Sequence, residues 1–181
     1  MNWRRRIRFL VVCLALAVIV YWRWDCWRAH RYDAVIMAAA RRYQVDPALV
    51  KAVVWRESRF RPDARGRAGE LGLMQIRETA AAEWAKAEGI PAFQHSACLD
   101  PGTNTLAGAW YLKQLLQRYA HTDNPATYAL ADYNAGRGNV LKWLKGAAAT
   151  HSAAFEEQIG FPSTRAYVRA ILHRAEYYRP M

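Results

Sequence analysis

The sequence has few cysteines, few acidic residues and no pattern of a β-strand. Its three cysteines, Cys13, Cys26 and Cys98, form no CxxC or other metal-ligand spacing, and its five histidines form none either, which argues against a structural metal. If the body of the chain were exported, Cys26 and Cys98 could pair, but we expect free thiols. No alternating apolar run bounded by hairpin turns occurs, so a β-rich fold is not expected.

Acidic residues number 15 against 26 lysines and arginines, which gives a formal net charge of +11. More than half of this excess lies in residues 1–32, which hold seven arginines and one aspartate. A basic chain suits nucleic acid, an acidic membrane surface or an anionic polymer such as a cell wall. Because no Lys/Arg-rich recognition helix and no zinc-finger spacing is present, we do not expect a nucleic-acid partner.

The chain also lacks an uncharged run of the ~20 residues that span a bilayer. Its long apolar run extends over 14 residues, from Phe9 to Trp22, and follows four arginines. Flanking arginines that snorkel, and a belt formed by Trp22 and Trp24, lengthen the reach of this run. The pattern predicts an export signal or a membrane anchor, with a buried core helix as the alternative.

An uncleaved anchor is the favoured outcome for this segment, and a cleaved signal is the alternative. A peptidase site follows the apolar run, whereas the small-x-small triplet Ala15-Leu16-Ala17 lies inside it. The arginines on the short N-terminal side predict that this end stays in the cytoplasm and that the body lies across the membrane. We therefore divide the chain into a signal anchor with a short tether, residues 1–32, and a single domain, residues 33–181.

From residue 33 onward the apolar residues recur at helical spacing, which predicts an all-α domain. Asp46 can cap a helix that has Pro47 at its first position. Residues 59–77 contain one proline and three glycines among polar residues, and predict a glycine-rich loop. The expected helices cover about 33–44, 47–58, 78–88, 103–120, 125–132, 138–146 and 163–178.

Glu57 continues the apolar stripe of the expected helix 47–58, because it lies three residues after Val54 and seven after Val50. Apolar surroundings and the negative end of a helix dipole both raise the pKa of a carboxyl group. A carboxyl group that stays protonated near neutral pH can act as a general acid toward a glycosidic oxygen. The alternative is a partly exposed Glu57 paired with a neighbouring arginine.

Several short motifs follow one another in this helical chain. They are Glu57-Ser58-Arg59-Phe60, Gly72-Leu73-Met74-Gln75-Ile76, Trp110-Tyr111-Leu112, Tyr133-Asn134-Ala135-Gly136 and, from Phe161 to Val168, FPSTRAYV. Each motif is weak alone, but in this order and spacing they resemble the SLT-type lytic transglycosylases, glycoside hydrolase family 23, which belong with the goose-type lysozymes. The resemblance covers roughly residues 35–178.

The resemblance implies a lysozyme-like helical domain with a glycine-rich active-site loop, preceded here by the N-terminal anchor helix. It implies cleavage of the MurNAc-GlcNAc β-1,4 bond of peptidoglycan, with formation of 1,6-anhydro-MurNAc ends and with no cofactor and no metal. Peptidoglycan strands are then the partner, and the sequence names no protein partner. Together with the anchor, this predicts a single-pass protein of the bacterial inner (cytoplasmic) membrane, with its catalytic domain in the periplasm or otherwise outside the membrane.

Roles for individual residues also follow from the resemblance. Glu57 would be the catalytic acid/base, and Ser58 would belong to the substrate-binding residues and order the end of its helix. Tyr133 and Asn134 would line the groove opposite Glu57, and the Tyr167 hydroxyl would lie near the reacting centre. The apolar stripe around Tyr167 also fits a plain core residue.

In the loop, the resemblance assigns Gly72, Leu73, Met74 and Gln75 to substrate binding. Gly72 would let the backbone approach the sugar. The thioether of Met74 and the amide of Gln75 would face the substrate N-acetyl group. The alternatives are core filling for Met74 and a solvated Gln75.

The sequence departs from the common family pattern at Gly66, where a serine is usual, and at Glu70 and Asp132, where alanine is usual. The two added carboxylates matter because ordinary glycoside hydrolysis needs a second acid across the cleaved bond. A lysozyme-like hydrolase is therefore one alternative function. A wall-binding module without catalytic activity is another.

Overall fold

A computed structural model describes residues 3–179, except for the side chains of Trp22 and Asp25. Helices supply the regular structure of this part, and its only β-like pairs are isolated bridges of Leu71 with Arg65 and with Ile76. The α-helices are α1 (Trp3–His30), α2 (Asp33–Tyr43), α3 (Pro47–Ser58), α4 (Glu78–Ala87), α5 (Pro101–Arg118), α6 (Pro125–Ala135), α7 (Arg137–Trp143), α8 (Ser152–Gln158) and α9 (Pro162–Tyr178). The 3-10 helices are η1 (His95–Leu99) and η2 (Gly146–Ala149). The predicted all-α fold is confirmed.

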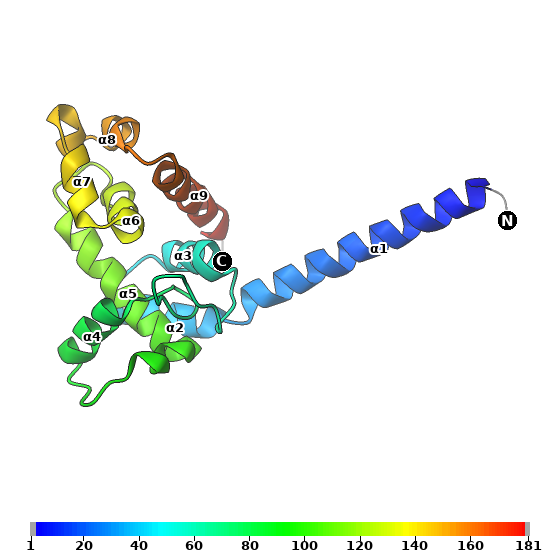
Figure 1. The fold of residues 1–181 in the computed structure, drawn as a ribbon, viewed down its shortest axis with the longest axis horizontal. Coiled ribbons are helices and arrows are strands. Elements are labelled where there is room, and N and C mark those ends of the chain that lie inside the picture. Colours follow the sequence, from blue (N-terminus) through cyan, green and yellow to red (C-terminus); the bar gives the residue numbers. More distant parts are fainter. Residues whose placement is uncertain (1–2, 180–181) are drawn as a thin grey trace.

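The central helix of the body is α3, because it is apolar on most of its circumference. Its first turn is fixed by Asp46, whose side chain accepts a hydrogen bond from the Ala48 amide at 2.9 Å, and by Pro47. Val50, Val53 and other residues of α3 are fully buried. Helix α9 packs along α3, and α6 bridges α9 to α5, which in turn packs on α2 (Figure 1).

The sequence-based helix limits agree with the structure to within about three residues. The predicted helices 33–44 and 47–58 correspond to α2 and α3. The sequence analysis missed α8, η1 and η2, since each is too short to display a helical period.

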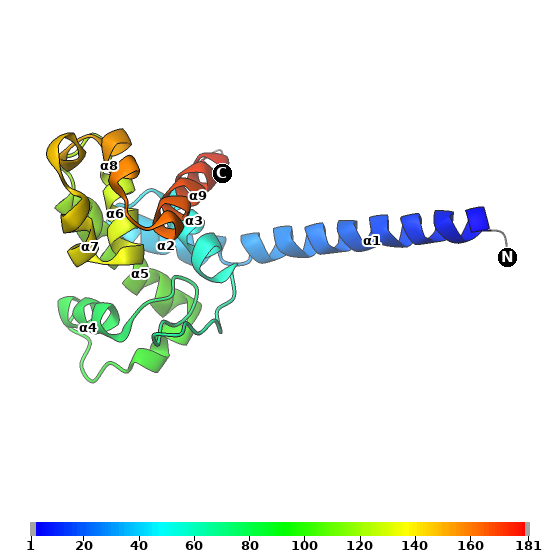
Figure 2. The same ribbon diagram turned by 45° about the horizontal axis from the view of Figure 1, so that its top comes forward.

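Helix α1 continues to His30, so the short tether that we expected at the end of residues 1–32 is mostly helical. Only a turn of Arg31 and Tyr32 separates it from α2. Figures 1 and 2 show α1 extending away from the body, and its large apolar residues between Phe9 and Val20 are 52–69% exposed. By length and composition this helix could cross a membrane, and a signal sequence would meet the same description.

The glycine-rich loop, residues 59–77, is held by its own backbone and by Asn104 of α5. Asn104 Nδ2 donates to the carbonyls of Leu71 at 2.8 Å and Cys98 at 2.7 Å, while Asn104 Oδ1 accepts from the Met74 amide at 2.7 Å. Gly72 has a φ of +76°, and a Cβ there would lie 2.3 Å from Asn104 Nδ2 and from the Cys98 carbonyl. Only glycine therefore fits at position 72.

Candidate active site

A groove with a volume of about 370 Å³ lies between the glycine-rich loop and α6. The end of α3, the start of α4 and the middle of α5 complete its walls. The lining residues are Glu57, Glu70, Gln75, Ile76, Arg77, Thr79, Ala80, Tyr111, Asp132, Tyr133, Asn134, Ala135 and Gly136. Four of the predicted site residues thus meet in one cavity, although they come from three separate motifs.

Glu57 occupies the last turn of α3 and is half-buried at the groove. The Tyr167 hydroxyl of α9 donates a hydrogen bond of 2.5 Å to Glu57 Oε1. Arg56 lies with its guanidinium carbon 5.3 Å from the centre of the Tyr167 ring. The structure therefore brings the predicted acid and the predicted tyrosine into direct contact, and no arginine forms an ion pair with Glu57 within the described residues.

Burial raises the pKa of Glu57, and the nearby Glu70 carboxylate raises it further. The hydrogen bond from Tyr167 and the charge of Arg56 act in the opposite direction and moderate this rise. Burial also raises the pKa values of Tyr133 and Tyr167 well above the ordinary tyrosine value, with the Glu57 charge as a further cause. Both phenols therefore remain protonated donors at neutral pH.

Tyr133 joins the two walls of the groove. Its hydroxyl donates to the Met74 carbonyl at 2.7 Å, and its ring lies 5.4 Å from that of Tyr111. Gln75 Nε2 donates to the carbonyls of Ala64 at 3.1 Å and Gly72 at 2.9 Å. The side-chain amide of Gln75 therefore links two parts of the glycine-rich loop, and Gln75 also lines the groove.

Asn134 lies at the rim of the groove and is exposed. Its side-chain oxygen accepts a hydrogen bond of 2.7 Å from the Thr164 hydroxyl of α9. This bond leaves the amide nitrogen as the donor that Asn134 can offer to a ligand. It also ties the rim of α6 to the start of α9.

Four residues that we expected to contact substrate are buried instead. The side chains of Leu73 and Met74 are fully buried, and Met74 packs so closely on α5 that a Cβ at Gly108 would lie 2.2 Å from its sulfur. Ser58 is buried and donates to the Val54 carbonyl at 3.1 Å, which agrees with a role in ordering the helix end rather than in binding sugar. Gly72 faces Asn104, not the groove. The need for glycine at position 72 is therefore explained by packing inside the protein, not by contact with a sugar.

The two unusual carboxylates both have partners inside the protein. Glu70 accepts from Arg77 Nε and from the Ala68 amide, each at 3.0 Å. Asp132 borders the groove, but its carboxylate is 2% exposed and accepts from Arg118 and from another buried side chain, the Tyr119 hydroxyl, at 2.8 and 2.7 Å. Among residues 3–179, no three His, Cys, Asp or Glu side chains form a cluster suited to a metal ion.

Sequence reasoning missed Arg77 and Tyr111 as groove residues. Tyr111 belonged to a matched motif, Trp110-Tyr111-Leu112, and this membership could have identified it. Arg77 had no such signal, because its contact with Glu70 depends on how the loop folds back on itself.

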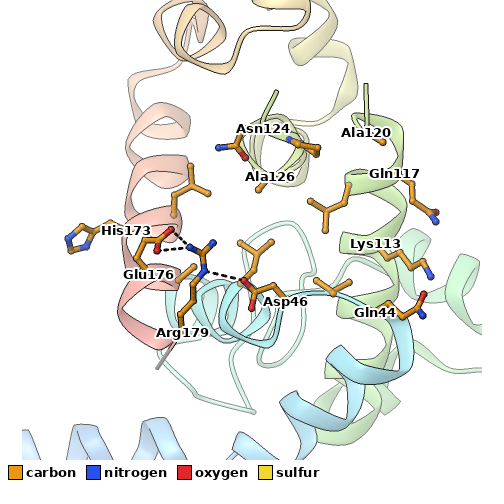
Figure 3. A pocket seen from close by; sticks show the side chains of 16 residues that line it. Gln44, Asp46, Lys113, Gln117, Ala120, Asn124, Ala126, His173, Glu176 and Arg179 are labelled. Carbon is orange, nitrogen blue, oxygen red and sulfur yellow. Dashed lines mark hydrogen bonds and ion pairs between the residues drawn. The ribbon is translucent and has the colours of Figure 1, made fainter. Parts of the chain in front are cut away.

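A larger cavity, about 760 Å³, lies between α5, α6 and α9 and contains none of the predicted site residues (Figure 3). Figure 3 shows Arg179 at one end of it, between Glu176 and Asp46. These charged groups pair with one another, and much of the remaining wall is apolar, including Leu49, Leu116 and Leu172. Because the carboxylates of this cavity, Asp46 and Glu176, are exposed and paired with Arg179, we assign the chemistry to the smaller groove.

Comparisons with known proteins identify relatives of this chain. Residues 34–155 match the family model described as Transglycosylase SLT domain. The chain is 33% identical over 150 residues to the soluble lytic murein transglycosylase of Salmonella typhimurium, which covers 82% of this chain and 23% of that protein. It is 35% identical over 138 residues to the Escherichia coli K12 protein of the same name, covering 75% of this chain and 21% of the relative.

Solved structures give the same relationship. An inactive Glu-to-Gln mutant of the lytic transglycosylase Slt from Pseudomonas aeruginosa has a TM-score of 0.73 at 32% identity, covering 82% of this chain and 24% of that one. A complex of the 70-kDa soluble lytic transglycosylase with bulgecin A has a TM-score of 0.74 at 31% identity, covering 83% and 24%. The chain spans less than a quarter of the length of these relatives. It belongs to the Transglycosylase SLT domain family.

Proposed function

We propose that the chain is a peptidoglycan lytic transglycosylase with Glu57 as its single catalytic acid/base. The observation that carries this proposal is the half-buried Glu57 carboxyl, whose pKa is raised by burial and whose Oε1 accepts from Tyr167 inside a groove. Such a group can hold a proton near neutral pH and release it to a glycosidic oxygen. The relatives named lytic transglycosylases support the same chemistry.

In the proposed reaction, Glu57 protonates the oxygen of the β-1,4 bond as the bond from MurNAc C1 breaks. The substrate N-acetyl group stabilises the positive charge that develops at C1. The Glu57 carboxylate then takes the proton of the MurNAc 6-hydroxyl while that oxygen attacks C1, which closes a 1,6-anhydro ring and restores the acid. Water is not consumed, and the Tyr167 hydroxyl stabilises the carboxylate between the two proton transfers.

Substrate contact is proposed for the residues that border the groove. Asn134, with its amide nitrogen as donor, and Gln75 are polar residues that line the groove. Tyr111 and Tyr133 supply aromatic surface against which sugar rings can pack. The buried Leu73 and Met74 would act by supporting the loop from behind.

A lysozyme-like hydrolase is the second candidate, because Glu70 lines the same groove as Glu57. Burial alone would raise the pKa of this carboxyl, but hydrogen bonds from the backbone amides of Glu70 and Ala68 and from Arg77 keep the pKa below the ordinary value. Mass spectrometry of sugar termini after digestion separates the two reactions, since an anhydro end and a reducing end differ by one water. Reducing ends as the main product would replace the transglycosylase proposal by the hydrolase.

A module that binds the wall without cutting it is the third possibility weighed from the sequence. The retained Glu57 and its raised pKa argue for turnover. Incubation of the protein with peptidoglycan sacculi, followed by analysis of soluble muropeptides, tests this directly. Binding without release of fragments would contradict catalysis.

For location, we propose a single-pass protein of the bacterial inner membrane, with α1 as an uncleaved anchor and residues 33–181 in the periplasm. The support is the exposed apolar surface of α1 and the arginines in its first turns, ahead of the apolar run. The relatives carry the word soluble in their names, so the anchor would distinguish this chain from them.

A further inference from the structure

A band of cationic and aromatic side chains runs along the seam between α3 and α9. Trp55 lies in the last turn of α3, and Arg59 follows the helix as its C-cap residue. Arg59 and Arg174 of α9 cover the Trp55 ring, with guanidinium carbons 4.1 and 4.2 Å from its centre. Arg174 also lies 5.5 Å from the ring centre of Tyr177, which is 69% exposed. We call Trp55, Arg59, Arg174 and Tyr177 the seam stripe.

The seam stripe begins next to the point where α1 joins the body. Lys51, one turn before Trp55 on α3, lies 4.9 Å from the ring centre of Tyr178 and forms an ion pair of 2.6 Å with Asp33. Asp33 is the first residue of α2 and follows the end of α1 by three positions. Figures 1 and 2 both draw the C-terminal end of α9 on the side of the body from which α1 extends.

The end of α1 carries the same kinds of side chain as the stripe. Arg31 lies over the rings of Trp27 and Tyr32, at 5.2 and 5.7 Å. Among residues 3–179, no ion pair with an acidic side chain involves Arg31, Arg59 or Arg174. Tryptophan and tyrosine collect at the membrane–water interface, and juxtamembrane arginines are attracted to anionic lipids. The side of the body that faces α1 therefore has the chemistry of a membrane-contact surface.

The length of α1 places this surface at the level of the lipid headgroups. Its 28 residues give a helix of ~42 Å, close to the ~40–45 Å of a bilayer with its headgroups. The two-residue turn that follows leaves little room for the body to move away. The catalytic domain would therefore contact the lipid headgroups with the side that carries the seam stripe.

The catalytic groove lies on another side of the molecule. Glu57 is two residues after Trp55, so the two side chains leave α3 roughly 200° apart. No residue of the seam stripe lines the groove. We propose that the seam stripe binds the headgroups of anionic phospholipids and thereby turns the groove away from the membrane, toward the wall. This inference rests on the proposed membrane anchor.

Photo-crosslinking of the full chain in lipid vesicles tests the proposal. Benzoylphenylalanine replaces Tyr177 in one protein and Leu141, an exposed residue of α7, in the control. Each is reconstituted in vesicles of phosphatidylcholine alone or with one quarter phosphatidylglycerol. We expect lipid adducts at position 177 in the anionic vesicles, far fewer in the neutral ones and few at position 141 in either.

A charge variant sharpens the test. Each arginine near an anionic surface contributes ~1 kcal/mol, so Arg59→Gln with Arg174→Gln should lower adduct formation at position 177 by roughly tenfold or more. Arg59→Lys with Arg174→Lys keeps both charges and should retain most of the adducts. The two double variants should digest soluble glycan strands at the same rate. Equal rates would show that both variants fold.

Three outcomes would overturn the inference. Equal lipid adducts at positions 177 and 141 would remove the preferred orientation. If peptidoglycan fragments were added to the vesicles and position 177 crosslinked to them in preference to lipid, the seam stripe would be a binding surface for the cell wall. A chain that alkaline washing strips from the vesicles would defeat the anchor proposal and this inference with it, while glycan digestion would still report separately on the enzymatic proposal.

Discussion

Glu57 and Tyr167 are 110 positions apart in the sequence, and one hydrogen bond of 2.5 Å joins them in the folded chain. The apolar stripe of α3 predicts the burial of Glu57, which raises its pKa. The contact of Tyr167 with Glu57 depends on the packing of α9 on α3. Helical periodicity within either segment does not predict this packing. Two residue-scale predictions follow from this pair.

Glu57→Gln should reduce release of soluble muropeptides by ~10²-fold or more, because the amide keeps the shape of the side chain but delivers no proton. The helix content measured by circular dichroism and the binding to sacculi should stay close to the wild-type values. A glutamate-to-glutamine mutant of the Pseudomonas aeruginosa relative is described as inactive, which agrees with this expectation. Retained turnover would point to another carboxylate, Glu70 first.

Tyr167→Phe should move the pH dependence of turnover toward higher pH. The Tyr167 hydroxyl favours the ionised form of Glu57, so its removal raises the pKa of that carboxyl further. Turnover depends on the protonated acid and declines as pH rises through its pKa, which places the decline at higher pH in the variant. A charged group gains ~1.5–3 kcal/mol from a hydrogen bond, so the maximal rate should also fall roughly tenfold or more.

The measurement for Tyr167→Phe is the initial rate of digestion across a pH series for both proteins. A structural role alone would lower the rate at every pH and leave the position of the decline unchanged. A decline that moved toward lower pH would contradict the assigned role of the hydroxyl.

At the scale of elements, the sequence predicts the long helices well because their signals are local. Asp46 and Pro47 define the start of α3, and the periodic apolar residues define its length. The loop is different. Its position was predicted, but the burial of Met74 and the pairing of Glu70 with Arg77 depend on contacts that the backbone makes only after folding back. The short tether expected before residue 33 is mostly helical, because charged residues suit an exposed helix as well as a linker.

The two added carboxylates should have separable roles. Glu70→Ala frees Arg77 and the Ala68 amide, so we expect digestion to fall by no more than about tenfold, with anhydro products retained. Asp132→Ala should also keep activity within about tenfold but lower the free energy of unfolding by ~1–3 kcal/mol, because the buried Tyr119 hydroxyl loses its acceptor.

Urea unfolding and product analysis measure both carboxylate effects. Asp132→Asn retains an oxygen acceptor and serves as the control, with a smaller loss of stability expected. If Glu70→Ala abolished turnover in a folded protein and the wild type produced reducing ends, the hydrolase alternative would prevail.

Gly72→Ala should disrupt the glycine-rich loop. The positive φ alone costs ~1–3 kcal/mol for a residue with a side chain, and the new methyl group would collide with Asn104 and the Cys98 carbonyl. We expect a lower melting temperature and weak digestion of sacculi. Gly69→Ala is a useful comparison, because its φ is also positive but a Cβ there meets no atom within 4 Å. Equal effects at both positions would show that the collision matters little.

For the whole molecule, the anchor proposal predicts where the chain is found. A fusion of residues 1–32 to a reporter that is active only outside the cytoplasm should give signal, and the fusion should stay at full length in the membrane fraction. Immunoblotting of membrane and soluble fractions gives the size and the location together. A shortened, soluble reporter would mean cleavage and would leave export intact, whereas an inactive reporter would contradict export.

The turn of Arg31 and Tyr32 between α1 and α2 has a consequence for how an anchored enzyme would search for substrate. Two residues span at most ~7 Å. The domain could therefore not move far from the bilayer surface, as it could on a long flexible linker. Its search would be confined to lateral diffusion in the plane of the membrane. Strands at one fixed height would be within reach, and layers of the wall farther out would be spared.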